Sequence, residues 1–258
     1  MEDIKTYIKQ IPPVTRYYMG IALLQAICYT YSIVRYDRFF LVFDKVREGE
    51  VWRLLTTYFF VGGFSMNFLF AMMMIYYSVS NVEKHFEGRA PDLTMLLIFN
   101  AFTVMIFGWL ANEYMVLQSS YVFSLLYVWT KLVPDQPMSI YGFPVKSANL
   151  PWVLIAFHIL TGGSPFADLV GVAAGHTYIY LKMVLPQSHG YDLLKNPNWV
   201  NYITKKCQEW EYGGTARGHG RVFGLNNEQG ENLNQRRAPP APERGPWGGR
   251  PVRIGGGD

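Results

Sequence analysis

Gly171-Val-Ala-Ala-Gly-His-Thr-Tyr-Ile-Tyr180 places two glycines four residues apart, with a histidine directly after the second, inside an apolar stretch. On a helix, two glycines at this spacing leave a flat strip on which a second helix backbone can approach closely. An ionisable side chain such as His176 is costly to hold in lipid, so we expect it to face the interior of a helix bundle or water. The stretch therefore predicts a closely packed helix in a membrane.

The composition of the whole chain also predicts a membrane protein. Of its 258 residues 50% are hydrophobic and 16% aromatic, and only 16% are charged, against about 25% in an average soluble domain. A membrane helix needs about 20 mostly apolar residues. Six segments fit that description, at 17–35, 56–80, 93–111, 114–131, 149–163 and 165–185. We therefore expect an all-α polytopic membrane protein with six spans.

The basic residues near the segment ends predict the orientation, because cytosolic loops carry an excess of Lys and Arg. Such residues stand before the first span, between the second and third, between the fourth and fifth, and after the sixth. The loops at 112–113 and 162–164 carry none, whereas residues 36–55 are a basic exception on the other side. Both chain ends are therefore expected in the cytosol. The first span lacks the features of a cleaved signal peptide, so we interpret it as a retained anchor.

The C-terminal part has a different composition, rich in Gly, Arg, Asn, Pro and Gln. A segment with so little to bury cannot offset its ordering entropy. We expect residues 1–200 to form the membrane domain and residues 201–258 to form a cytosolic, largely disordered tail. Trp247 has no core to join there, so docking into a groove on a partner is its functional interpretation. The modest net charge of +4 does not favour nucleic-acid binding.

The candidate catalytic residues are few. An intramembrane serine protease needs a serine activated by a histidine and donors for the oxyanion. The fourth span contains Ser119, Ser120 and Ser124, but bulky residues flank them where glycines would admit a substrate. We therefore expect no catalytic residue, and interpret His176 as structural or as lining a hydrated cavity. Asn67 in the second span is expected to hydrogen-bond a neighbouring helix.

No cofactor or metal site is expected either. The two cysteines, Cys28 and Cys207, fall in a predicted membrane helix and in the predicted tail. They are therefore expected to lie too far apart for a disulfide or a shared metal ion.

Several motifs together resemble the derlins, a proteolytically inactive branch of the rhomboid superfamily. They are Trp52-Arg53, Asn67, Phe86-Glu-Gly-Arg-Ala-Pro-Asp92, Leu126-Tyr-Val-Trp129, Leu150-Pro-Trp-Val-Leu154 and Gly171-xxx-Gly175-His176. They stand in the expected order over about the first 200 residues. The resemblance implies a rhomboid-like six-helix transmembrane bundle in the endoplasmic reticulum membrane.

The Trp52-Arg53 pair in the first loop suits the headgroup boundary. There an indole is half buried and a guanidinium meets a phosphate or a carboxylate. An ordinary interfacial anchor and a structural role specific to the family both remain open.

The resemblance implies a non-enzymatic subunit of the machinery that exports misfolded proteins to the cytosol for ubiquitination and destruction. Its expected partners are those misfolded proteins, a ubiquitin-ligase complex of the endoplasmic reticulum, the lipid bilayer and further subunits in a homo- or hetero-oligomer. Many derlins end in a glycine-rich box that binds the cytosolic AAA ATPase valosin-containing protein. The tail resembles that box at Trp247, Gly248, Gly249, Arg253 and Gly255, with one extra residue and a proline at 251.

Export of this kind needs no chemistry. A short span such as the fifth would thin the surrounding bilayer by mismatch, and polar groups at mid-depth would wet a lateral groove. The candidates for such a groove are Asn67, Asn100, Ser119, Ser120, His158 and His176. Three alternatives remain: an active intramembrane protease with a non-standard serine, a carrier of small solutes, and a scaffold without a groove.

Overall fold

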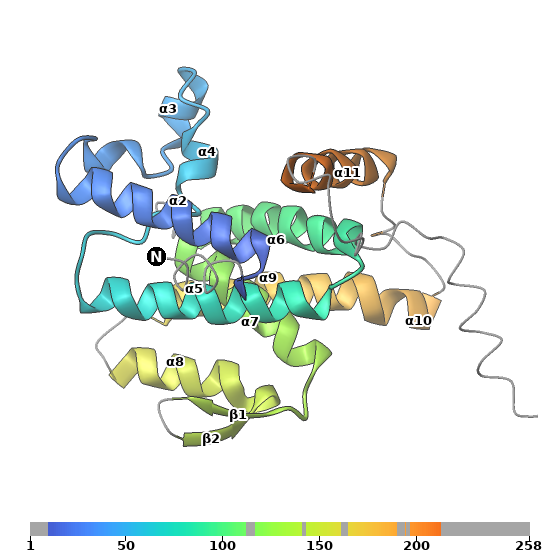
Figure 1. Ribbon diagram of the computed structural model, residues 1–258. Coiled ribbons are helices and arrows are strands. Elements are labelled where there is room, and N and C mark those ends of the chain that lie inside the picture. The colour runs from blue at the N-terminus through green and yellow to red at the C-terminus, as the bar shows by residue number, and fades with distance from the viewer. Residues whose placement is uncertain are drawn as a thin grey trace, which may run out of the picture. The chain divides into compact units, whose positions relative to one another are not determined.

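The computed structural model describes residues 10–111, 117–140, 143–160, 165–189, 194 and 197–212. These residues are mostly helical. In chain order the elements are α2 (Pro13–Thr30), η1 (Tyr36–Arg38), α3 (Phe43–Arg47), α4 (Arg53–Thr56), α5 (Met66–His85), α6 (Ala90–Leu110), α7 (Gln118–Leu132), β1 (Pro137–Ile140), β2 (Phe143–Lys146), η2 (Ser147–Asn149), α8 (Leu150–Leu160), α9 (Phe166–Ile179), η3 (Tyr180–Val184), α10 (Leu185–His189) and α11 (Asn198–Tyr212) (Figure 1).

A helix occupies each of the six segments that the sequence marks as spans: α2, α5, α6, α7, α8 and α9. Among the described residues, one helix is both long and apolar enough to cross a membrane, namely α6, with a mean hydropathy of 2.0. The next apolar stretch, 147–160, is shorter than a full span. A mostly helical protein is therefore confirmed, and the bundle of six spans stays a prediction.

The predicted start of the second span, at residue 56, is wrong by ten residues. The chain turns at Gly62, whose φ of +93° suits a residue without a Cβ. Helix α5 then begins at Met66, because the Ser65 hydroxyl caps it by accepting a hydrogen bond from the Phe68 N–H at 3.2 Å. Residues 56–65 therefore belong to α4 and the connection that follows it.

The expectation of an all-α protein also needs a correction, because a two-stranded antiparallel sheet lies between α7 and α8 (Figure 1). Its register pairs Pro137 with Lys146 and Met138 with Val145. Tyr77 of α5 donates a hydrogen bond from its hydroxyl to the sulfur of Met138 at 3.1 Å. The hairpin thus packs on the helices instead of forming an independent unit.

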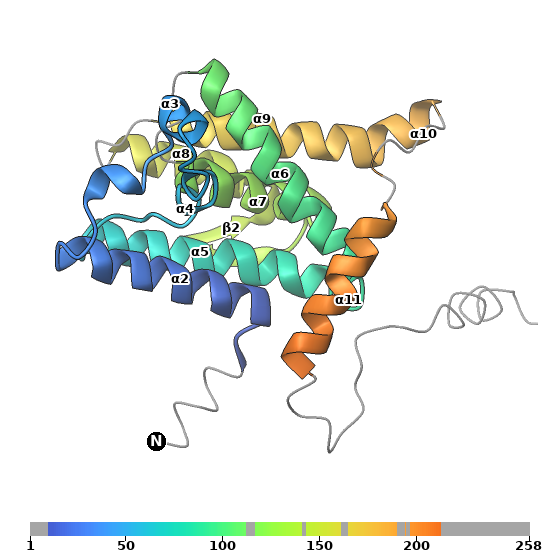
Figure 2. The same ribbon diagram turned by 90° about the horizontal axis from the view of Figure 1, so that it is seen from above.

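Helix α7 forms the centre of the core. Twelve of its residues are buried, including Leu125, Val128 and Trp129, and a helix that is buried all round needs partners on every side. Those partners are α5, α6, α8 and α9, which all pack against it (Figure 2). Residues of α7 can therefore face a site built from several helices.

The N-terminus of α2 is capped by a carboxylate from a different helix. Its first residue is Pro13, and Pro12 at the cap position offers no side-chain acceptor. Glu83, near the end of α5, instead accepts hydrogen bonds from the N–H groups of Val14 at 2.8 Å and Thr15 at 2.9 Å. This pairing satisfies amide groups that a helix leaves without partners at its start, and it fixes α2 against α5.

Helix α11 runs across residue 200, the predicted boundary between membrane domain and tail. It packs on α6, where the Thr204 hydroxyl lies 3.1 Å from the Thr94 hydroxyl. The end of the predicted tail, including its glycine-rich box, lies outside the described residues. The division into two domains stays a prediction.

Candidate functional site

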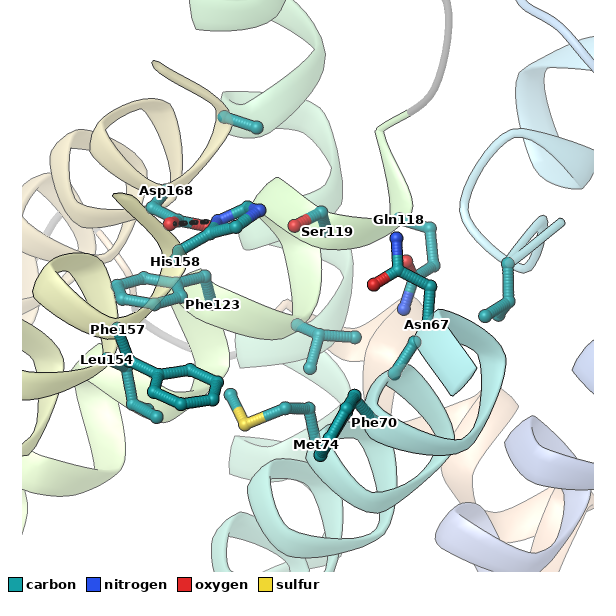
Figure 3. A pocket seen from close by; sticks show the side chains of 14 residues that line it. Asn67, Phe70, Met74, Gln118, Ser119, Phe123, Leu154, Phe157, His158 and Asp168 are labelled. Carbon is teal, nitrogen blue, oxygen red and sulfur yellow. Dashed lines mark hydrogen bonds and ion pairs between the residues drawn. The ribbon is translucent and has the colours of Figure 1, made fainter. Parts of the chain in front are cut away.

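A cavity of about 520 Å³ lies among α5, α7, α8 and α9. Most of its wall is apolar and is made of Val61, Phe70, Ala71, Met74, Val122, Phe123, Leu154, Phe157 and Ala167. Its polar side chains are Asn67, Gln118, Ser119, His158 and Asp168. Figure 3 shows these polar groups together along one side, with Phe70, Met74 and Phe157 on the other and Phe123 beside His158. The cavity thus combines an apolar wall with a row of hydrogen-bonding groups.

A histidine and a carboxylate form the charged part of that row. His158 near the end of α8 and Asp168 in the first turn of α9 lie 2.7 Å apart, from Nδ1 to Oδ2 (Figure 3). An ionised carboxylate only accepts hydrogen bonds, so the imidazole Nδ1–H donates. The Asp168 side chain is 3% exposed, whereas the His158 side chain is 39% exposed. The aspartate is therefore a buried support, and the histidine is the member that a ligand in the cavity can touch.

The start of α7 supplies the remaining polar groups. Gln118 and Ser119 are its first two residues and line the cavity. The first N–H groups of a helix lack partners within the helix and can bind an acceptor. Opposite them, Asn67 lies in the first turn of α5. The hydrogen bond expected between Asn67 and another helix is not present among the described residues, because its side chain faces the cavity.

Three of the six groove candidates proposed from the sequence line the cavity, and Asn100, Ser120 and His176 do not. Asn67, Ser119 and His158 line the cavity. Asn100 and Ser120 point elsewhere and are buried between helices, and neither side-chain atom of Asn100 has a partner among the described residues. Gln118 and Asp168 also line the cavity and were not expected from the sequence. The available signal was an acidic residue in the first turn of a helix, ten residues after a histidine.

His176 is bound by a tyrosine and not by a serine. Its Nδ1 lies 3.1 Å from the Tyr127 hydroxyl of α7, and the residue is exposed. Ser124, one turn earlier on α7, donates its hydroxyl hydrogen to the Tyr121 carbonyl at 2.7 Å. The described contacts therefore provide no serine–histidine pair at His176, and His176 is not part of the cavity wall.

Gly171 and Gly175 lie against the backbone of α7. A Cβ added at Gly171 would stand 2.5 Å from the Ser120 carbonyl oxygen, and one at Gly175 would stand 2.8 Å from that of Ser124. Such distances are shorter than any ordinary contact between carbon and oxygen. The close approach of α7 and α9 positions Ser119 and Asp168 on two sides of one cavity.

Arg53 holds the first loop together. Its guanidinium is 4% exposed and lies 2.5 Å from the Glu50 carboxylate. It also donates to the carbonyls of Asp37 and Phe40, the latter at 3.0 Å. The neighbouring Trp52 is 47% exposed. The guanidinium thus meets a carboxylate and two carbonyl groups, while the indole points outward.

Metal binding finds no support in this part of the chain. Across the residues that the structure describes, no group of three or more His, Cys, Asp or Glu side chains could hold a metal ion. The five tail residues proposed for partner binding, Trp247, Gly248, Gly249, Arg253 and Gly255, lie outside the described residues.

Comparison with known proteins identifies the family. The model of the Der1-like family matches residues 11–198. Derlin-1 of Arabidopsis thaliana is 33% identical over 215 residues, which cover 80% of this chain and 78% of that protein. Derlin-1.2 of Zea mays is 31% identical over 211 residues, covering 80% and 86%, and the probable derlin-1 homolog of Dictyostelium discoideum is 29% identical over 211 residues, covering 80% and 87%. The resemblance drawn from the sequence motifs is confirmed, and this chain belongs to the Der1-like family of derlins.

Proposed function

We propose that this chain is a non-catalytic component of endoplasmic-reticulum-associated degradation, which assists the passage of misfolded proteins from the endoplasmic reticulum to the cytosol. Membership of the derlin family implies a membrane protein with a role in this degradation. The observation that carries the finer proposal is the cavity with its apolar wall and its polar row.

The polar row lowers the cost of moving a polypeptide through the membrane. In dry lipid each unsatisfied backbone group costs several kcal/mol. The side chains of Asn67 and Gln118 each offer both a donor and an acceptor, and the Ser119 hydroxyl does the same. They can bind the backbone of a partly unwound segment while the apolar wall holds its side chains.

A short helix beside the cavity supports local thinning of the bilayer. The predicted fifth span, 149–163, would at 1.5 Å per residue be roughly 22 Å long, against a hydrocarbon core of about 30 Å. The structure describes its helix α8 as far as Leu160. A span this short draws the two leaflets together. We propose that the cavity opens to lipid at this thinned place, with both chain ends of the protein in the cytosol.

Site-specific crosslinking tests the cavity as the place where a client binds. A photoreactive phenylalanine analogue at Phe157, inside the cavity, should crosslink to a misfolded membrane protein in intact membranes. The matched control is the same analogue at Phe102 of α6, which is exposed but not on the cavity wall. Ala71→Trp should fill the cavity and abolish the crosslink from Phe157. Equal crosslinking from both positions would contradict the proposal.

The partners are proposed from the family. A ubiquitin-ligase complex would receive the client, and the cytosolic ATPase valosin-containing protein would extract it through the segment Trp247 to Gly255. A pull-down of the ATPase from mild detergent, comparing the full chain with one ending at Ala241, tests this. Loss of the ATPase on truncation supports recruitment by the tail, and equal recovery moves recruitment to another part of the protein.

The alternative of an active intramembrane serine hydrolase has one observation in its favour. Ser119, His158 and Asp168 line one cavity, and a serine, a histidine and a carboxylate are the components of an acyl-transfer site. It ranks second because no hydrogen bond joins Ser119 to His158 in the described residues. A fluorophosphonate probe distinguishes the two: labelling that Ser119→Ala removes and Ser124→Ala retains would establish the hydrolase.

A further inference from the structure

Helix α11 presents an apolar face that the rest of the described protein does not cover. One side of the helix is buried against the protein through Val200 and Thr204. The large side chains of Trp199, Tyr202 and Ile203 are exposed, and Tyr202 is the most exposed of the three at 62%. We call these three side chains the outer face of α11.

The position of α11 along α6 indicates what covers this face. Figures 1 and 2 show α11 passing across the N-terminal end of α6 instead of running beside it. The contact is made at Thr94, in the second turn of α6. Among the described residues α6 is the helix that is long and apolar enough to cross a membrane. A helix that crosses the end of a membrane-spanning α6 would lie along the membrane surface.

The chemistry of the outer face fits that depth. Tryptophan and tyrosine gather at membrane–water interfaces because their rings are apolar and carry a polar group. Lys205 and Lys206 are exposed on the same helix, and the Lys206 ammonium lies 5.4 Å from the centre of the Tyr202 ring. Lys84 and Arg89 stand exposed just before α6. This end of the protein therefore offers several cations to anionic lipid headgroups.

We propose that α11 binds the membrane surface, with its outer face at the acyl-chain boundary and its lysines on the headgroups of anionic phospholipids. The segment after the last predicted span is thus an interfacial helix and not the start of a freely moving tail. This assignment does not depend on the export function, since it concerns the chemistry of one surface.

A fluorescent label measures the depth of the helix. With Cys28→Ser, Cys207 is the single cysteine of the chain; it is exposed and lies one turn after Ile203. The full chain, labelled there with a nitrobenzoxadiazole dye, is placed in vesicles of phosphatidylcholine with phosphatidylserine. The control carries the dye at Asn201→Cys in a chain with Cys28→Ser and Cys207→Ser, on the other side of the helix.

Spin-labelled lipid should quench the dye at 207, and aqueous iodide should quench the dye at 201. Trp199→Ser with Tyr202→Ser should make the dye at 207 accessible to iodide. In the unmodified chain, quenching by lipid should decrease as the salt concentration is raised. Lys205→Glu with Lys206→Glu should remove this salt-dependent part of the quenching. Iodide access at 207 equal to that at 201 would overturn the proposal and leave the face to a protein partner. Equal lipid quenching with and without phosphatidylserine would overturn the headgroup assignment.

Discussion

Gly171→Ala should destabilise the protein, because the new methyl group has no room. Its Cβ would lie 2.5 Å from the Ser120 carbonyl oxygen and 2.9 Å from the Phe123 Cβ, while ordinary contacts begin at 3.4 Å. The oxygen belongs to a helix backbone and cannot turn aside, so α7 and α9 must separate. Overpacking of this kind costs about 1–3 kcal/mol. For a chain of this size the melting temperature should fall by roughly 2–12 °C.

Thermal unfolding in mild detergent measures the effect, followed by tryptophan fluorescence. The matched control is Gly20→Ala on α2, where nothing lies within 4 Å of the added Cβ. Alanine favours a helix over glycine by about 1 kcal/mol, so this control should melt at or above the temperature of the unmodified chain. If Gly171→Ala melts as high as Gly20→Ala, close packing of α7 and α9 does not stabilise the protein.

Three further predictions concern the loop and the helix cap. Arg53→Met removes the donor to two carbonyl groups and to the Glu50 carboxylate, which should lower the free energy of unfolding by about 1.5–3 kcal/mol. Arg53→Lys should recover part of that loss. An unchanged melting temperature in both variants would refute the role of Arg53 in holding the first loop together. Glu83→Ala leaves the Val14 and Thr15 N–H groups unpaired and should cost about 1–3 kcal/mol, with hydrogen exchange rising first at the start of α2. Glu83 lies in the last turn of α5, after residue 80, where the predicted second span ends. Burial raises its pKa above 4.5, although hydrogen bonds from Val14 and Thr15 oppose this. The folded protein therefore binds the proton of the Glu83 carboxyl group more tightly than the unfolded chain does. The stability that comes from this proton is fully present below about pH 4.5 and is lost as pH rises through the folded pKa of Glu83. Glu83→Gln should flatten that part of the profile of melting temperature against pH, and an identical slope would contradict the assignment.

The positions of the helices could be predicted because they rest on local patterns. Apolar stretches between clusters of charge locate α2, α6 and α9 directly. The start of α5 was missed although the signals are present, since Gly62 and Ser65 are a turn residue and a cap inside an otherwise apolar stretch. Apolar content alone does not mark where a helix begins.

The site could be predicted only in part, because it depends on how the helices are rotated. Asn100 and Ser119 look alike in an apolar sequence, yet one is buried between helices and the other faces the cavity. The pairing of His176 with Tyr127 likewise depends on the register of α9 against α7, which two close glycines permit but do not specify. His158 and Asp168 meet across the connection between two helices, and no spacing rule predicts that contact.

The proposed role of the cavity is to carry substrate without catalysis. The most direct measurement is the half-life of a misfolded membrane reporter in cells whose own derlins are removed. Degradation should be restored equally by the unmodified chain and by Ser119→Asn, which keeps a donor and an acceptor in the polar row but has no nucleophilic hydroxyl. Ala71→Trp, which fills the cavity but should leave the protein folded, should not restore it. Loss of degradation with Ser119→Asn, or full activity with Ala71→Trp, would contradict a cavity that carries substrate without catalysis.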